Sequence, residues 1–311
     1  MKKNQWLLLA LTALAWFNAG TVWLIQFSGY PIWPAVGRAA FAAYFQFWQQ
    51  STWTVVVLPF ALTAAGSLLL LIMAWSKFRR WMLCLGLALQ LAVEFVRSFL
   101  LSPLERNVAL LSGQPDGPAY RQLIAANWLL ICLVTTYALF ALWMLSRTLS
   151  VPSGISRSRR LLFVISALGL YAVGNIWFVQ LVSYRLWPYV GKKEAYAYHI
   201  AWWHSIWGVL FVPAGVVLLG SLAMLWIRPD GVSRKTGRLG FALQLVIYIV
   251  TGAWFAPLMA RLATQDAGLS LPLYHLLMTT HWVRLALFTA YGVVCCYMLA
   301  KSARGSQWRP A

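Results

Sequence analysis

Acidic side chains are scarce in this sequence. Only 6 Asp and Glu stand against 25 Lys and Arg in 311 residues, and charged residues together make up 10% of the chain. A soluble domain of this length covers itself with far more charge. The scarcity therefore excludes a soluble globular protein. It also argues against a proton-driven transporter that relies on several carboxylate relays.

Several functional motifs are absent as well. The chain has no Walker A motif, no G-x-G-x-x-G before a soluble helix, and no H-E-x-x-H or C-x-x-C motif. No lysine lies in the middle of a long apolar stretch, which disfavours a retinal Schiff base. The four cysteines, all within apolar stretches, are best interpreted as small packing residues: Cys84, Cys132, Cys295 and Cys296.

Long apolar stretches dominate what is present. Hydrophobic residues make up 61% of the chain, and stretches such as Val55–Trp75 and Val209–Ile227 can cross a hydrocarbon layer of about 30 Å. A spanning segment must satisfy its own backbone groups, so helices are expected. The sequence predicts an all-α polytopic integral membrane protein with a lipid bilayer as its partner. Its eight predicted spans are 5–27, 40–75, 82–102, 122–145, 161–183, 197–227, 239–260 and 275–299.

The basic residues divide unequally between the two sets of span ends. Of the Lys and Arg outside the spans, 16 fall at the ends shared by the two termini and 7 at the opposite ends. The positive-inside rule then predicts a multi-pass protein of the inner (plasma) membrane with both termini in the cytoplasm. The net charge of +19 is thus a topology signal, and no basic patch in a soluble context indicates nucleic-acid binding.

The chain contains an internal repeat. A shift of 154 residues, which carries Gly20 onto Gly174 (174 − 20 = 154), aligns the two halves without a gap. The matched pairs include Trp23 and Trp177, Gln26 and Gln180, Tyr30 and Tyr184, Trp33 and Trp187, Trp48 and Trp202, and Pro59 and Pro213. Each copy has an even number of spans, so the repeats are parallel, with their symmetry axis near the membrane normal.

The repeat predicts the domain organisation. We expect a first four-helix repeat at 1–148, a basic cytoplasmic linker at 149–160, a second four-helix repeat at 161–302, and a basic cytoplasmic tail at 303–311. These two units are called the first repeat and the second repeat below.

All four histidines lie in the second repeat, near the non-cytoplasmic ends of two spans. They are His199 and His204 in one span, and His275 and His281 in another. Histidine pairs at one depth on two helices of a bundle favour a transition-metal or haem site. The spacings of five and six residues place neither pair on one helical face, so His204 with His281 is the expected core pair.

Comparison of the two repeats supports that choice. His204 and His281 align with the polar residues Gln50 and Asn127, which suggests positions that face the protein interior. The counterparts of His199 and His275, which are Phe45 and Arg121, indicate positions nearer the interface. One alternative is that these histidines only hydrogen-bond a neighbour or contact lipid headgroups, and another is that they relay protons or bind a substrate.

Three further ionisable residues lie within the predicted spans. Glu94 and Arg97 are three residues apart, so they share a helical face and are expected to pair. Arg284 has no carboxylate nearby in the sequence. We expect it to bind a haem propionate, a quinone oxygen or an anionic substrate, or to pair with Glu94 across the bundle.

Two functional hypotheses follow. In the first, the protein is a membrane-embedded redox or metal/haem-binding protein with His204, His281 and Arg284 at its cofactor. A redox role would make it a membrane oxidoreductase. In the second, it is a transporter, channel or structural subunit that handles a small or lipophilic compound without a bound cofactor. A quinone or another lipophilic molecule suits either hypothesis, and a structural role would add partners in a membrane complex.

Overall fold

The computed structural model describes residues 3–75, 78–111, 117–149, 156–264 and 271–305. Within these residues the chain is helical and contains no strand. Of the predicted linker, residues 150–155 lie outside the described residues, as do residues 306–311 of the predicted tail.

The elements follow one another in the same order in both repeats, except that the second repeat has one additional short α-helix. The first repeat contains α1 (Lys3–Leu24), η1 (Ile25–Gly29), η2 (Tyr30–Ala35), α2 (Arg38–Thr52), η3 (Trp53–Val57), α3 (Leu58–Ala74), α4 (Arg80–Phe95), η4 (Val96–Leu101), α5 (Ser102–Leu111) and α6 (Pro118–Leu149). The second contains α7 (Arg157–Phe178), η5 (Val179–Ser183), α8 (Tyr184–Leu186), η6 (Trp187–Tyr189), α9 (Ala195–Ile206), η7 (Trp207–Phe211), α10 (Val212–Ala223), α11 (Arg234–Val250), η8 (Thr251–Phe255), α12 (Ala256–Thr264) and α13 (Leu271–Gly305).

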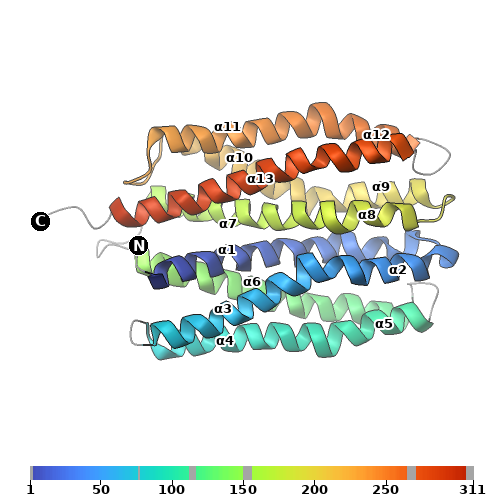
Figure 1. The fold of residues 1–311 in the computed structure, drawn as a ribbon, viewed down its shortest axis with the longest axis horizontal. Coiled ribbons are helices and arrows are strands. Elements are labelled where there is room, and N and C mark those ends of the chain that lie inside the picture. Colours follow the sequence, from blue (N-terminus) through green and yellow to red (C-terminus); the bar gives the residue numbers. More distant parts are fainter. Residues whose placement is uncertain (1–2, 76–77, 112–116, 150–155, 265–270, 306–311) are drawn as a thin grey trace, which may run out of the picture.

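These elements join into eight helices that are long and apolar enough to cross a membrane, as predicted. They are Lys3–Ala35, Arg38–Ala74, Arg80–Leu110, Pro118–Thr148, Arg157–Tyr189, Ala195–Ala223, Arg234–Leu262 and Pro272–Ala303. The helices run side by side, and α1 begins at the same end of the bundle at which α13 ends (Figure 1). We call this the terminal end and the opposite one the far end.

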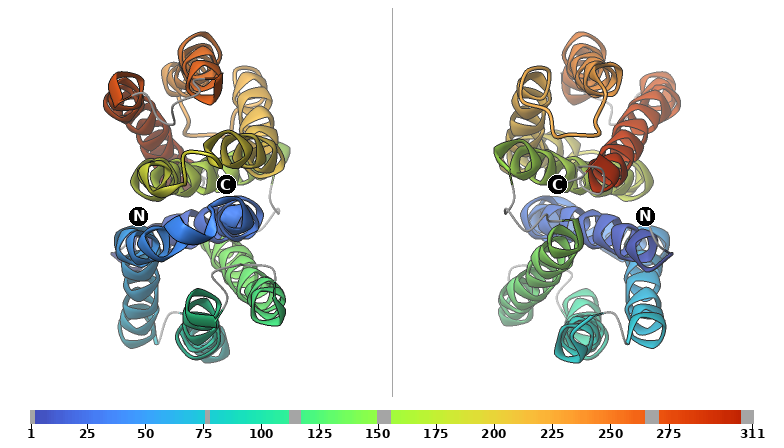
Figure 2. Two further views of the ribbon diagram at one scale, coloured as in Figure 1. Left: turned by 90° about the vertical axis from the view of Figure 1, so that its right-hand side faces the viewer. Right: turned by 90° about the vertical axis from the view of Figure 1, so that its left-hand side faces the viewer.

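The two repeats form two halves of the bundle. Seen end on, the first repeat fills one half and the second repeat the other, with α1 and α7 packed against each other between them (Figure 2). The first and fifth spans are consequently the most buried of the eight, whereas the third and seventh lie on the outside and expose much of their apolar surface. Such exposed apolar surface is suited to contact with lipid.

Hydrogen bonds between side chains recur at the same offset of 154 residues. Ser67 and Tyr137 are 2.7 Å apart through their hydroxyls, and so are Ser221 and Tyr291. The indole of Trp23 donates to Thr135 at 3.0 Å, and a matching bond of 3.1 Å runs from Trp177 to Thr289. The repeat in the sequence therefore corresponds to a repeat in three-dimensional contacts.

The repeats contact each other through equivalent residues, as a two-fold arrangement requires. A Cβ atom added to Gly20 would collide with the carbonyl oxygen of Tyr171, and one added to Gly174 with the carbonyl oxygen of Phe17. Small residues let membrane helices approach this closely. Towards the far end, the hydroxyls of Tyr44 and its counterpart Tyr198 lie 3.0 Å apart.

Short π-helical segments interrupt the spans at matching places. η1 and η3 recur 154 residues later as η5 and η7, and η4 overlaps with η8 after the same shift. Prolines explain most of them: Pro59, Pro103, Pro213 and Pro257 each follow two residues after such a segment ends. Proline has no N–H to donate and its ring displaces the carbonyl four residues earlier, so the turn before it widens.

We predict that the contact between α1 and α7 tolerates no extra methyl group. Gly20→Ala should lower the stability by about 1–3 kcal/mol, because the backbone of the two helices must move apart. Thermal unfolding of the detergent-purified protein measures this. The matched control is Gly252→Ala, since a Cβ at Gly252 has no atom within 4 Å. Equal melting temperatures for the two variants would contradict the prediction.

Candidate functional site

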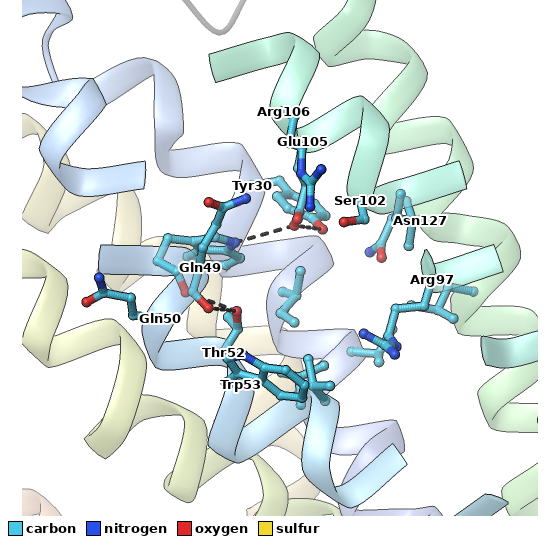
Figure 3. A pocket seen from close by; sticks show the side chains of 17 residues that line it. Tyr30, Gln49, Gln50, Thr52, Trp53, Arg97, Ser102, Glu105, Arg106 and Asn127 are labelled. Atoms are coloured by element: carbon cyan, nitrogen blue, oxygen red, sulfur yellow. Dashed lines mark hydrogen bonds between the residues drawn. The ribbon is translucent and has the colours of Figure 1, made fainter. Parts of the chain in front are cut away.

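The first repeat lines a partly open cavity of about 480 Å³. Its wall includes residues of α2 and α5, which lie in the far half of the bundle (Figure 1). All four spans of this repeat contribute to its wall (Figure 3). The apolar part of the wall includes Val22, Ile25, Val56 and Leu130. The polar part consists of Tyr30, Trp48, Gln49, Gln50, Thr52, Arg97, Ser102, Glu105, Arg106 and Asn127. Small-molecule sites combine apolar wall surface with converging polar groups, and the volume lies in their usual range.

Glu105 is the carboxylate of this cavity. Its Oε1 accepts a hydrogen bond of 2.7 Å from the Tyr30 hydroxyl and a longer one of 3.4 Å from the Trp48 indole (Figure 3). Tyr30 follows η1, Trp48 lies in α2 and Glu105 in α5, so three spans meet at this carboxylate. Two neutral donors hold it in place, and its charge is available to a ligand.

Two arginines line the same cavity. Arg97 lies in η4, where its guanidinium donates to Glu94 Oε2 at 2.7 and 3.1 Å, which confirms the predicted pairing of these residues. Glu94 itself does not line the cavity, whereas Arg97 does. Arg106 follows Glu105 in α5 and also lines the space (Figure 3). The cavity thus presents one carboxylate and two guanidinium groups among neutral amides and hydroxyls.

The three π-helical segments of the first repeat all border the cavity. Ile25 of η1, Trp53 of η3, and Arg97 and Leu101 of η4 are part of its lining. A π-helical turn is wider than an α-helical one, and such turns are frequent at functional sites. The prolines that follow η3 and η4 therefore help to shape this space.

The corresponding place in the second repeat is nearly filled, with a void of about 20 Å³. Larger side chains replace smaller ones along its wall. Trp203 stands where the first repeat has Gln49, Phe211 where it has Val57, and Phe255 where it has Leu101. The two repeats therefore share a scaffold but differ in the room they leave at its centre.

The charge at the centre also differs between the repeats. Met259 takes the place of Glu105, and Arg284 takes the place of Leu130. The Arg284 guanidinium lies 5.4 Å from the Phe255 ring and 5.9 Å from the Phe288 ring. Among the described residues no carboxylate contacts it, so the predicted alternative of a pair with Glu94 is wrong.

His281 is buried and held by Gln180. The Gln180 amide nitrogen donates to the Met278 carbonyl at 3.3 Å, so its oxygen faces His281 Nδ1 at 2.6 Å. This assignment places a proton on Nδ1 and leaves Nε2 with a lone pair. Nε2 is buried without a hydrogen-bond partner among the described residues. In the first repeat, Asn127 makes the same bond to Gln26 at 2.7 Å.

The other three histidines do not join it. His204 is exposed, which corrects the expectation that it faces the interior with His281. His199 is buried beside Trp187 and Trp202. His275 is exposed, as a residue near the interface would be. The polar counterparts in the first repeat therefore predicted burial correctly for His281 and wrongly for His204.

The four histidines predicted to hold a metal or haem lie in different surroundings. No group of three or more His, Cys, Asp and Glu within them is arranged to hold a metal ion. His281 packs at 4.8 Å from the Tyr184 ring and 5.3 Å from the Phe255 ring. The void beside these rings is far smaller than a haem.

Sequence reasoning missed Glu105, which is the central group of the cavity. The predicted third span ended at 102, which left Glu105 and Arg106 in an external connection, whereas the helix continues through α5. The repeat held a usable signal. Pro103 matches Pro257, so the helical segments after these prolines correspond, and Glu105 aligns with the apolar Met259.

Comparison of the chain with known proteins gave no match to a family model, a curated protein or a solved structure.

We predict that His281 stabilises the fold through its hydrogen bond to Gln180. His281→Asn should keep the stability within about 1 kcal/mol of wild type, because Asn127 makes the same bond in the first repeat. His281→Leu should cost about 1–3 kcal/mol, since it leaves the buried Gln180 oxygen unpaired. Thermal unfolding in detergent distinguishes the two. Equal losses in both variants would show that the imidazole has another role, such as ligation.

Proposed function

We propose that the protein binds a small amphipathic molecule in the cavity of the first repeat and serves to carry or pass it within the membrane. Of the two hypotheses drawn from the sequence, this is the transporter, channel or structural subunit that works without a bound cofactor. The observation that carries the proposal is the difference between the repeats: one matched position is open and polar, and the other is closed by aromatic side chains.

The chemistry of the wall describes the ligand. Val22, Ile25, Val56 and Leu130 suit an apolar body. Glu105, held by Tyr30 and Trp48, suits a hydrogen-bond donor or a cationic group on that body. Arg97 and Arg106 suit an acceptor such as a carbonyl, quinone or carboxylate oxygen. A lipophilic compound with a polar end that both donates and accepts satisfies the whole wall.

Buried charge gives independent support for a ligand. An ionisable residue inside a membrane span costs roughly 2.5–3.5 kcal/mol on insertion scales, and such residues normally mark a pathway or a binding site. Glu105 is not part of an ion pair with Arg97, because Arg97 pairs with Glu94. Glu105 therefore has no ion-pair partner within 4 Å among the described residues.

The test fills the first cavity with the residues that the second repeat already accommodates. We predict that Gln49→Trp combined with Val57→Phe lowers the amount of co-purifying lipophilic compound at least about tenfold, because the added rings occupy its place. Mass spectrometry of organic extracts of the detergent-purified protein gives the measurement. The melting temperature should stay near that of wild type, since Trp203 and Phe211 fit the same scaffold.

The matched control is a double variant that makes the opposite changes in the second repeat. Trp203→Gln combined with Phe211→Val should leave the compound bound to the first repeat in place. Equal amounts of every extracted compound in wild type and in the filled variant would refute the proposed site.

A further inference from the structure

The second repeat has three buried donors around its small void. Trp202 Nε1, Arg284 Nε and Thr251 Oγ1 are each buried without a hydrogen-bond partner among the described residues. All three residues line the void of about 20 Å³, together with Tyr184. Buried polar groups are normally satisfied, so three such groups at one void indicate a missing partner.

The missing partner must accept hydrogen bonds and carry negative charge. An indole N–H and a guanidinium N–H can only donate, and the Thr251 hydroxyl can donate as well. Arg284 is only 5% exposed and contacts no carboxylate among the described residues, so its charge is uncompensated inside a span. A water molecule would accept some of these bonds but would leave the charge in place, which is costly at low dielectric.

The first repeat shows which chemical group the matching donors bind. In it, the counterparts of Trp202 and Tyr184, which are Trp48 and Tyr30, both donate to the carboxylate of Glu105. In the second repeat the same two donors remain, but Met259 stands in place of Glu105. The second repeat therefore has the same two donors, lacks the carboxylate and has a cation nearby.

We propose that the second repeat binds a small monovalent anion, of the size of chloride, between Trp202, Tyr184, Thr251 and Arg284. The void is of the size that holds one water-sized particle, so a halide fits and a polyatomic organic anion does not. The bound anion takes the role that the Glu105 carboxylate has in the first repeat. The site is separate from the cavity of the proposed function and does not depend on it.

The experiment compares thermal unfolding of the full-length, detergent-purified protein in sodium chloride, sodium bromide and sodium gluconate at equal ionic strength. A ligand that binds only the folded state raises the melting temperature, and the rise grows with the logarithm of the ligand concentration above its dissociation constant. We expect chloride and bromide to raise it by about 2–4 °C over gluconate. Equal melting temperatures in all three salts would overturn the proposal and leave a water molecule as the occupant.

Two variants locate the effect. Met259→Glu supplies an internal carboxylate where the anion binds, so its melting temperature should be at least that of wild type in chloride and should no longer respond to halide. Arg284→Leu introduces the residue that the first repeat has at the matching position, and it should also abolish the response of the melting temperature to halide. Gln50→Ala, in the first cavity, is the control and should keep it. A halide response that survives in both Met259→Glu and Arg284→Leu would place the anion elsewhere and overturn the proposal.

Discussion

The hydrogen bonding of the backbone is the constraint from which the rest of this structure follows. Inside a bilayer each carbonyl of a helix needs a donor, and a proline removes one. Here the turns before Pro59, Pro103, Pro213 and Pro257 widen. Side chains can then donate hydrogen bonds to the carbonyls that are freed. Asn175 donates to the Val209 carbonyl at 3.1 Å, four residues before Pro213. The widened turns lie at the level where the first repeat holds its cavity.

The same constraint explains what the two repeats have in common. Because both carry the same widened turns and the same inter-span hydrogen bonds, the scaffold does not depend on what lies at its centre. In the first repeat the centre holds Glu105 and open space, and in the second it holds aromatic rings and Arg284. Trp48 and Trp202 occupy matching positions in both, yet only Trp48 has a carboxylate to bond.

The sequence was sufficient for the fold class, because length and hydrophobicity determine which segments can span a membrane. It also predicted the ion pair of Glu94 and Arg97, which depends only on helical spacing. It did not predict the site, because the inward direction of a residue near a span end depends on helix rotation and on π-helical turns. His204 and Glu105 show both errors: one polar residue faces outward, and the other lies beyond the expected end of a span.

The hydroxyl pair of Tyr44 and Tyr198 has an implication for the origin of the chain. Two equivalent residues touch only on a symmetry axis, so a single four-span protein that formed a homodimer would show the same contact. In such a dimer any change to one site changes the other. Joining the two subunits into one polypeptide removes that coupling. An ancestral pair of identical sites could then become an open site and a closed one.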